Sequence, residues 1–166
     1  MTFANRISQV LHEEHRATVA LMERLEQFLA RQRGKPPAAT DQATARLMSD
    51  LSAGVEAEVQ RHFDFEEQQL FTFLDRAGDS AIGSHLASEH DAMRPLGKRL
   101  ADLARAGAVG GFDPGGWDEF QRLGSELCER MLMHVQKEEM ALLPLLDEMI
   151  DAETEAKLYE SYVENR

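Results

Sequence analysis

Apolar residues recur every three or four positions through four long stretches of this chain, and this period restricts the fold more than any other feature. An α-helix has 3.6 residues per turn, so residues spaced in this way form one stripe along a helix. The first stripe contains Ile7, Leu11, Val19, Met22 and Leu25. Comparable stripes follow at Val55 and Val59, at Leu86 and Met93, and at Leu127 and Met131. The pattern predicts four amphipathic helices.

Segments rich in glycine and proline, or in short polar residues, separate these stretches. They lie at Gly34–Pro37, Asp75–Asp79 and Gly107–Gly116, and they leave stretches of roughly 27–35 residues, each long enough for a bundle helix. Asp41 or Thr40, and Asp113, are expected to cap helix N-termini. Long helices joined by short loops pack most simply as an up-down-up-down four-helix bundle. We therefore expect an all-α fold.

The whole chain, residues 1–166, is expected to form a single domain. The four-helix core should span about residues 5–148, and an amphipathic tail over about 151–164 is expected to form a short C-terminal extra helix. The scarcity of Val and Ile relative to Ala, Leu and Glu agrees with a helical rather than a β fold.

The charge of the chain restricts its partners. Eighteen basic residues against 30 acidic ones give a formal net charge of −12, which repels phosphate backbones and anionic lipid, so we expect neither nucleic acid nor a membrane surface as a partner. The single cysteine, Cys128, permits no disulfide within the chain and no cysteine-based zinc site. It is expected to be a packed thiol. The start of the sequence has no signal-peptide pattern, so we expect a cytoplasmic protein.

The chain also repeats itself weakly. Glu14-His15-Arg16 matches Glu89-His90-Asp91, and the segment HFDFEEQQLFTFL at 62–74 aligns with HVQKEEMALLPLL at 134–146. Two helical hairpins of similar design therefore build the predicted bundle, around a pseudo-two-fold axis. A group that functions in one hairpin is expected to have a counterpart in the other.

Four of the six histidines fall where an apolar stripe would otherwise be interrupted. There is one on each predicted helix, three or four residues from an apolar member of its stripe: His15, His62, His90 and His134. Glu66 follows His62, and Glu138 follows His134, by four residues, about one helical turn, and each faces the same way as its histidine. Four imidazoles and two carboxylates are therefore expected to point into the middle of the bundle.

Burying these groups without partners would be costly, because an unpaired buried polar group costs roughly 2–7 kcal/mol and a bare carboxylate much more. First-row transition metals resolve the conflict, since imidazole nitrogen and carboxylate oxygen are suitable ligands for them. One His-x-x-x-Glu arises readily by chance, and a single histidine on an apolar stripe is usually a hydrogen-bonded core residue. Two copies, each preceded by a histidine on another helix, predict a metal site. The spacing alone fits iron, manganese or zinc.

The order His, His-x-x-x-Glu, His, His-x-x-x-Glu over about residues 5–148 resembles the hemerythrin-like, or HHE cation-binding, family. The resemblance implies a four-helix bundle with two non-haem iron ions bridged by oxide or hydroxide. It implies that His15, His62, His90 and His134 are terminal ligands and that Glu66 and Glu138 bridge the irons.

The sequence departs from the oxygen-carrying hemerythrins at two positions. They have a further histidine four residues before the one that matches His90, where this chain has Leu86, and they have His-x-x-x-x-Asp where this chain has His134-x-x-x-Glu138. The ligand pattern is closest to the di-iron domain of the repair-of-iron-centres proteins. Their additional Cys-bearing N-terminal domain is not found in this sequence.

Two functions follow from this resemblance. The first is a binding or sensing protein whose centre takes up O2, nitric oxide or iron for sensing, storage or a stress response. The second is an enzyme or repair factor that acts on peroxide or nitric oxide, or donates iron to damaged iron–sulfur clusters. A purely structural metal is a third reading, but structural sites are usually closed, whereas four histidines and two carboxylates leave positions open. The sequence leaves a homo-oligomer open and identifies no protein partner.

Several nearby residues have more than one reading in the sequence. His12 lies about 60° around the helix from His15, so it is either a spare group near the site or a bystander, whereas His85 is expected to be exposed. Glu67 and Glu139 either orient ligating imidazoles or form solvated salt bridges. Three aromatic residues are expected outside the central layer, as packing or interface residues: Trp117, Tyr159 and Tyr162. Phe63, Phe65, Phe71 and Phe73 are expected to wall the site or to pack around it.

Overall fold

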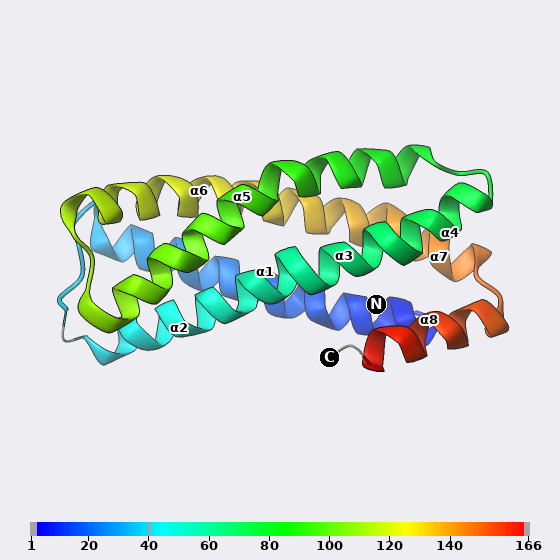
Figure 1. Ribbon diagram of the computed structural model, residues 1–166, viewed down its shortest axis with the longest axis horizontal. Coiled ribbons are helices and arrows are strands. Elements are labelled where there is room, and N and C mark those ends of the chain that lie inside the picture. Colours follow the sequence, from blue (N-terminus) through cyan, green and yellow to red (C-terminus); the bar gives the residue numbers. More distant parts are fainter. Residues whose placement is uncertain (1–2, 40, 165–166) are drawn as a thin grey trace.

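The computed structural model describes residues 3–39 and 41–164, and most of them are helical (Figure 1). Within these ranges there is no β-strand, and none of the helices is long and apolar enough to cross a lipid bilayer. The predicted all-α class is confirmed. The α-helices and the wider π-helical segments (η) follow in chain order: α1 (Arg6–Gln32), α2 (Gln42–Glu56), η1 (Ala57–His62), α3 (Phe63–Phe65), η2 (Glu66–Leu70), α4 (Phe71–Arg76), α5 (Ala81–Gly110), α6 (Pro114–Lys137), η3 (Glu138–Leu142), α7 (Leu143–Met149) and α8 (Ala152–Glu164).

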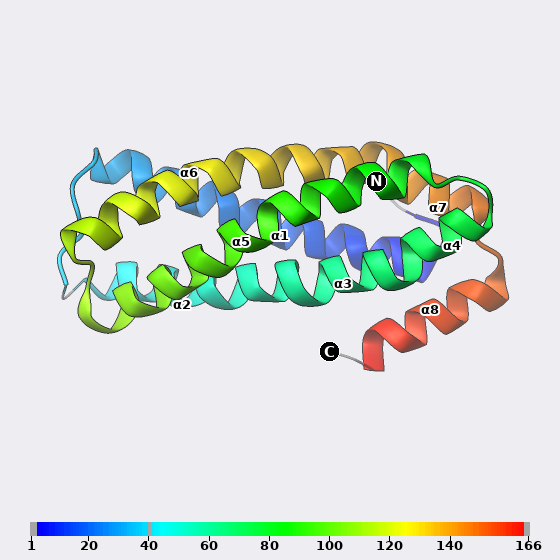
Figure 2. The ribbon, with the colours of Figure 1, turned by 45° about the horizontal axis from the view of Figure 1, so that its top comes forward.

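These elements form four antiparallel helical columns (Figures 1 and 2). We call them the first column (α1), the second (α2 to α4), the third (α5) and the fourth (α6 to α7). α1 packs against α2 and α6, and α5 packs against the same two helices, so each column contacts two neighbours. The α1–α2 and α5–α6 connections lie at one end of the bundle and the α4–α5 connection at the other. The structure is therefore the expected up-down-up-down bundle.

Side-chain caps fix where the columns begin. Asn5, Asp41 and Asp113 each accept a hydrogen bond from a backbone N–H in the first turn of α1, α2 and α6. These bonds satisfy donors that the helix itself cannot pair. The predictions for Asp41 and Asp113 are confirmed, and the alternative cap, Thr40, lies outside the described residues.

The second and fourth columns differ from the uninterrupted α-helices that the spacing predicts. The second column widens into π-helical turns at η1 and η2, and the fourth does so at η3. In a π-helical turn the backbone bonds to the fifth residue instead of the fourth, and such turns gather at functional sites. η2 and η3 begin at Glu66 and Glu138, which are equivalent positions of the internal repeat. The two hairpins therefore share this change in backbone hydrogen bonding as well as their sequence pattern. η1, which ends at His62, has no such counterpart, because residues 129–134 belong to α6.

The C-terminal tail forms the predicted extra helix, α8, which lies along the outside of the bundle (Figure 2). Glu155 of α8 accepts hydrogen bonds from the backbone N–H and the guanidinium of Arg6 at the start of α1. Tyr162, near the end of α8, is buried against Phe65. α8 is therefore held at both ends, against α1 at its start and against Phe65 of α3 near its end.

Substituting Leu127 with alanine should destabilise the protein strongly. The Leu127 side chain is fully buried in a hydrophobic core, and truncating such a leucine leaves a cavity that costs about 2–5 kcal/mol. Met133, on the same helix, is 54% exposed, so Met133→Ala is the matched control and should change stability little. Urea unfolding followed by circular dichroism measures both, and equal effects would contradict this packing.

Candidate metal centre

The six side chains predicted to bind metal meet midway along the bundle. Each is at most 1% exposed: His15, His62, Glu66, His90, His134 and Glu138. They lie between two separate hydrophobic cores. On α1, for example, Leu11 belongs to one core and Met22 to the other, with His15 between them. The six residues therefore form a polar layer that divides the apolar interior.

The four imidazoles form two pairs with their Nε2 atoms facing each other. The Nε2 atoms of His15 and His62 are 3.2 Å apart, and those of His90 and His134 are 3.1 Å apart. Each pair joins two neighbouring columns, the first with the second and the third with the fourth. The pairs are equivalent under the internal repeat, and they agree with a division of four histidines between two metals.

The two carboxylates lie between the imidazole pairs. Glu66 Oε1 is 3.2 Å from His62 Nε2 and 3.5 Å from His90 Nε2, so it reaches both pairs. Glu138 Oε1 is 2.6 Å from His134 Nε2 and 3.7 Å from His15 Nε2. All four oxygens of these carboxylates are buried and have no hydrogen-bond partner among the residues described. Their position matches the bridging role that the family resemblance implies.

A second ring of carboxylates surrounds the imidazoles and contacts their other nitrogen. The Nδ1 atoms of His15, His90 and His134 are 3.1, 2.8 and 2.9 Å from carboxylate oxygens. The partners, in the same order, are Glu139, Glu67 and Glu89. An ionised carboxylate only accepts hydrogen bonds, so the proton of each neutral imidazole lies on Nδ1. The Nε2 lone pair is then free for a metal, which is the usual arrangement around metal-bound histidine.

His62 differs from the other three histidines. Its Nδ1 has no hydrogen-bond partner in the described structure, and the nearest carboxylates are those of Glu14 at 3.6 Å and Glu58 at 3.7 Å. Glu14 is the repeat counterpart of Glu89. Glu58 is buried, whereas its counterpart in the repeat is the exposed Arg130. The surroundings of His62 therefore break the pseudo-symmetry.

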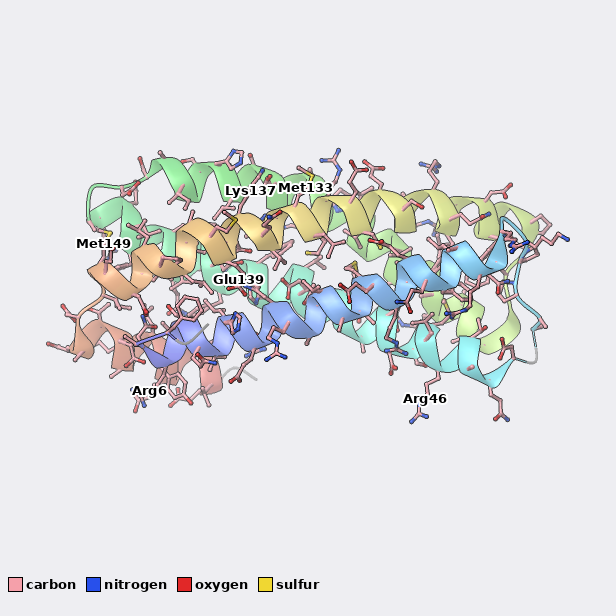
Figure 3. The ribbon with its side chains drawn as sticks, turned by 180° about the vertical axis from the view of Figure 1, so that it is seen from behind. Arg6, Arg46, Met133, Lys137, Glu139 and Met149 are labelled. Atoms are coloured by element: carbon pink, nitrogen blue, oxygen red, sulfur yellow. The ribbon has the colours of Figure 1, made fainter. Side chains whose placement is uncertain are left out.

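Basic groups cover the outer sides of the four repeated carboxylates. Glu139 is 2.8 Å from Nδ1 of His12, while the other three have these partners: Glu67 with Arg94, Glu89 with Lys137, and Glu14 with Arg61. In Figure 3, Glu139 lies between the fourth column and α1, and Lys137 lies at the edge of the fourth column that adjoins α5. From the centre of the bundle outward, each imidazole is therefore followed by a carboxylate, and each carboxylate by a basic group.

The pKa shifts of His134 and Glu66 agree with metal donors, whereas that of His62 does not. Burial alone would lower the pKa of His62, but the carboxylates of Glu58 and Glu66 outweigh it and raise that pKa. Burial lowers the pKa of His134 to about 4, which leaves this imidazole neutral at pH 7. Burial alone would raise the pKa of Glu66, but the His62 and His90 imidazoles outweigh it and hold the pKa below its usual range. Neutral imidazole and ionised carboxylate are the protonation states that bind metals.

The structure also places the other residues singled out from the sequence. His12 lies beside Glu139 and is outside both groups of donors that could hold an ion. His85 is exposed, as predicted, and its Nε2 is 3.2 Å from Lys137 Nζ. Cys128 is the expected packed thiol, since burial raises its pKa to about 12.

Tyr162 lies outside the layer of six donors and packs in a hydrophobic core, as predicted, but it also contacts the outer carboxylate of Glu14. Its hydroxyl donates a hydrogen bond to Glu14, and its ring lies beneath the guanidinium of Arg61. The contacts of Tyr162, Glu14, Glu58 and Glu89 were missed at the sequence level. The only sequence feature that singled out Glu14 and Glu89 was the repeated Glu-His pair to which each belongs. Each of these glutamates contacts the histidine of the neighbouring column instead of the histidine that follows it in sequence.

Comparison with known families decides what kind of bundle this is. The model of the hemerythrin HHE cation-binding domain matches residues 6–146. The chain belongs to the hemerythrin HHE family. None of the curated proteins compared with the chain matches it. Two groups of donors at the centre of this HHE bundle could each hold an ion, because the ligand atoms within each group lie within 4.8 Å of one another. Glu138 belongs to both groups: Glu66, His90, His134 and Glu138, and His15, His62 and Glu138.

These residues fit the metals that an HHE domain implies. Four carboxylate oxygens have no hydrogen-bond partner, and the Nε2 atoms of each imidazole pair face each other. Several buried lone pairs are therefore concentrated at the centre of the bundle. Without a cation, such groups would be costly to bury. The family and this donor set together support a metal-binding protein.

Removing the carboxylate of Glu139 should weaken metal binding, because His15 loses the group that fixes its ring. Glu139→Ala is expected to lower the affinity about 10- to 100-fold, and Glu139→Gln, which keeps an acceptor oxygen, should lower it less. Glu148→Ala, at an exposed position of α7, is the control. Competition with a chelator measures the affinities, and equal values in all variants would contradict the orienting role.

Proposed function

We propose that this chain is a non-haem di-iron protein of the hemerythrin type that binds O2, nitric oxide or iron. The proposed ligands are His15, His62, Glu66, His90, His134 and Glu138, with Glu66 and Glu138 shared between two metals. The observation that carries the proposal is the pairing of Nε2 atoms on either side of two unpartnered carboxylates. The donor chemistry also suits manganese or zinc. Iron is proposed because the family resemblance implies it.

The same donor set supports the binding of a small molecule. Two imidazoles and two shared carboxylates would give each metal four protein ligands, so a six-coordinate ion held there would keep a position for a small molecule. Leu86, one turn before His90, is apolar and buried, so it adds no further donor. A redox-active metal pair with free positions supplies the chemistry for holding O2 or nitric oxide.

The protein's own residues would hold the centre ready for such a ligand. Phe63 stacks on the His90 ring at 3.8 Å between centroids, with an angle of 6° between the planes, and so fixes the imidazole from its face. Glu67 fixes the same ring through Nδ1. With hydrophobic cores on both sides, each of the six donors is at most 1% exposed. A site held rigidly in this way favours binding without rearrangement of the protein.

Replacing Glu66 with glutamine should lower the metal content, because an amide binds iron poorly and cannot balance the charge of two cations. Wild-type protein reconstituted anaerobically with Fe(II) is expected to bind two ions per chain, and Glu66→Gln one or none. Glu23→Gln, at an exposed position of α1, should match the wild type. Elemental analysis after gel filtration makes the comparison. A wild type with well under one metal per chain would sink the proposed centre.

Titration of the reduced, iron-loaded protein should distinguish binding from catalysis. We expect spectral changes with O2 or nitric oxide that reverse when the gas is removed, because the centre has free positions and keeps all its protein ligands. Absorption spectroscopy in an anaerobic cuvette follows this directly. Rapid consumption of peroxide, or transfer of iron to a protein lacking its iron–sulfur cluster, would instead establish the enzyme or repair alternative.

A further inference from the structure

Glu58 is a buried carboxylate of the second column whose equivalent position in the fourth column carries no carboxylate. It lies on η1, one turn before His62, and it is 4% exposed. Its repeat counterpart is Arg130, which is exposed and pairs with Glu126. The metal centre needs no such group in the second hairpin, so Glu58 serves the first hairpin alone.

The carboxylate of Glu58 is only half satisfied. Its Oε2 accepts a hydrogen bond from the Thr18 hydroxyl at 3.1 Å, while Oε1 is buried and has no partner in the described structure. Oε2 is also 3.7 Å from Nδ1 of His62. A buried carboxylate oxygen with no partner is unfavourable, so this oxygen indicates a cationic or hydrogen-bonding group that binds there.

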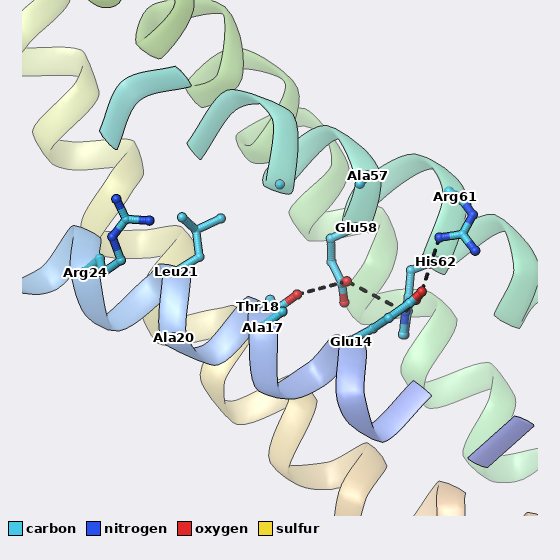
Figure 4. Close-up of a pocket in the computed structure, with 11 residues that line it drawn as sticks. Glu14, Ala17, Thr18, Ala20, Leu21, Arg24, Ala57, Glu58, Arg61 and His62 are labelled. Carbon is cyan, nitrogen blue, oxygen red and sulfur yellow. Dashed lines mark hydrogen bonds and ion pairs between the residues drawn. The ribbon is translucent and has the colours of Figure 1, made fainter. Parts of the chain in front are cut away.

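A pocket of about 350 Å³ lies against this carboxylate, between α1 and the α2–η1 segment (Figure 4). We call it the α1–α2 pocket. Its outer wall includes the exposed Ala17 and Ala57, and its inner wall includes the buried Glu58 and His62. Small side chains keep the outer part open. The pocket therefore leads from the surface to the edge of the proposed centre.

Two arginines that line the pocket do not neutralise Glu58. Arg61 donates to Glu14 at 3.2 Å, and Arg24 donates to Asp50 at 3.2 Å. Both cations are therefore already paired with other carboxylates. The second hairpin has no equivalent arrangement, because the counterpart of Thr18 is the apolar Met93, which is buried.

We propose that the α1–α2 pocket is the site through which a divalent metal cation enters the centre, with Glu58 as its first buried ligand. This inference rests on the proposed function. Carboxylate and hydroxyl oxygens suit a hydrated divalent cation, and six waters at about 30 Å³ each occupy about 180 Å³, which the pocket accommodates. Glu58, His62 and Glu66 follow one another at four-residue intervals. A cation leaving Glu58 therefore reaches the His62 side of the centre and then Glu66.

The test compares the rates at which the metal-free protein takes up cobalt(II), followed by stopped-flow absorbance. Ala17→Phe fills the outer wall of the pocket without changing charge. Its matched control is Ala92→Phe, at the exposed position of α5 that is equivalent to Ala17 in the repeat. Glu58→Gln removes the proposed first ligand and is expected to slow uptake about 10-fold, within the range by which focused charge accelerates association.

We expect Ala17→Phe to slow both uptake and chelator-driven release by a similar factor, since one passage serves both directions, and Ala92→Phe to behave as wild type. If Ala17→Phe does not fold by circular dichroism, Ala57→Phe on the opposite wall replaces it. Uptake as fast in the pocket variants as in wild type overturns the proposal. A Glu58→Gln variant with weaker equilibrium binding but a normal uptake rate also overturns it, because Glu58 then only positions His62. A wild type that takes up no cobalt, iron or manganese refutes the proposed function itself.

Discussion

The hydrogen bonds between imidazole Nδ1 atoms and outer carboxylates are the interactions on which the rest of the centre depends. They place the proton of His15, His90 and His134 on the outer nitrogen, so that the Nε2 lone pairs face inward. A ring free to flip would present a donor to the interior half of the time. The outer carboxylates in turn have partners on their outer sides: the cations of Arg94 and Lys137 pair with Glu67 and Glu89, and Nδ1 of His12 lies beside Glu139. The donor geometry at the centre therefore depends on charges located near the solvent.

The repeat explains most of this arrangement, and the departures from it are concentrated in one place. The proposed ligands, the outer glutamates and the π-helical turns at η2 and η3 all occur twice, at equivalent positions of the two hairpins. The exceptions gather around His62, where η1, Glu58 and the contact with Tyr162 of α8 have no counterpart in the other hairpin. The two halves of the centre are consequently equivalent in their inner donors and unequal in their surroundings.

The sequence predicted the helices and the buried donors because both depend on local period. A histidine in an apolar stripe must face the core whatever its neighbours are, and a glutamate four residues later faces the same way. The partners of the imidazoles were harder to predict. Glu89 contacts His134 of another column, and Glu14 is the carboxylate nearest to Nδ1 of His62. The histidine that follows each of these glutamates in sequence is therefore not the one it contacts. The π-helical turns also escaped prediction, since the apolar spacing through them is close to that of an α-helix. Two of these turns, η2 and η3, begin at Glu66 and Glu138, the carboxylates that face the imidazoles.

The polar layer also separates the interior into two hydrophobic cores. Side chains in one core do not pack directly on those in the other, and distant residues with no shared partner contribute almost independently to stability. The half of the bundle around Leu47, Phe120 and Trp117 can therefore accumulate substitutions without disturbing the half around Ile7, Leu74 and Leu146. The layer between them links the two halves and tolerates little change. Such a division leaves each core free to diverge at its own pace while the proposed ligand set between them is retained.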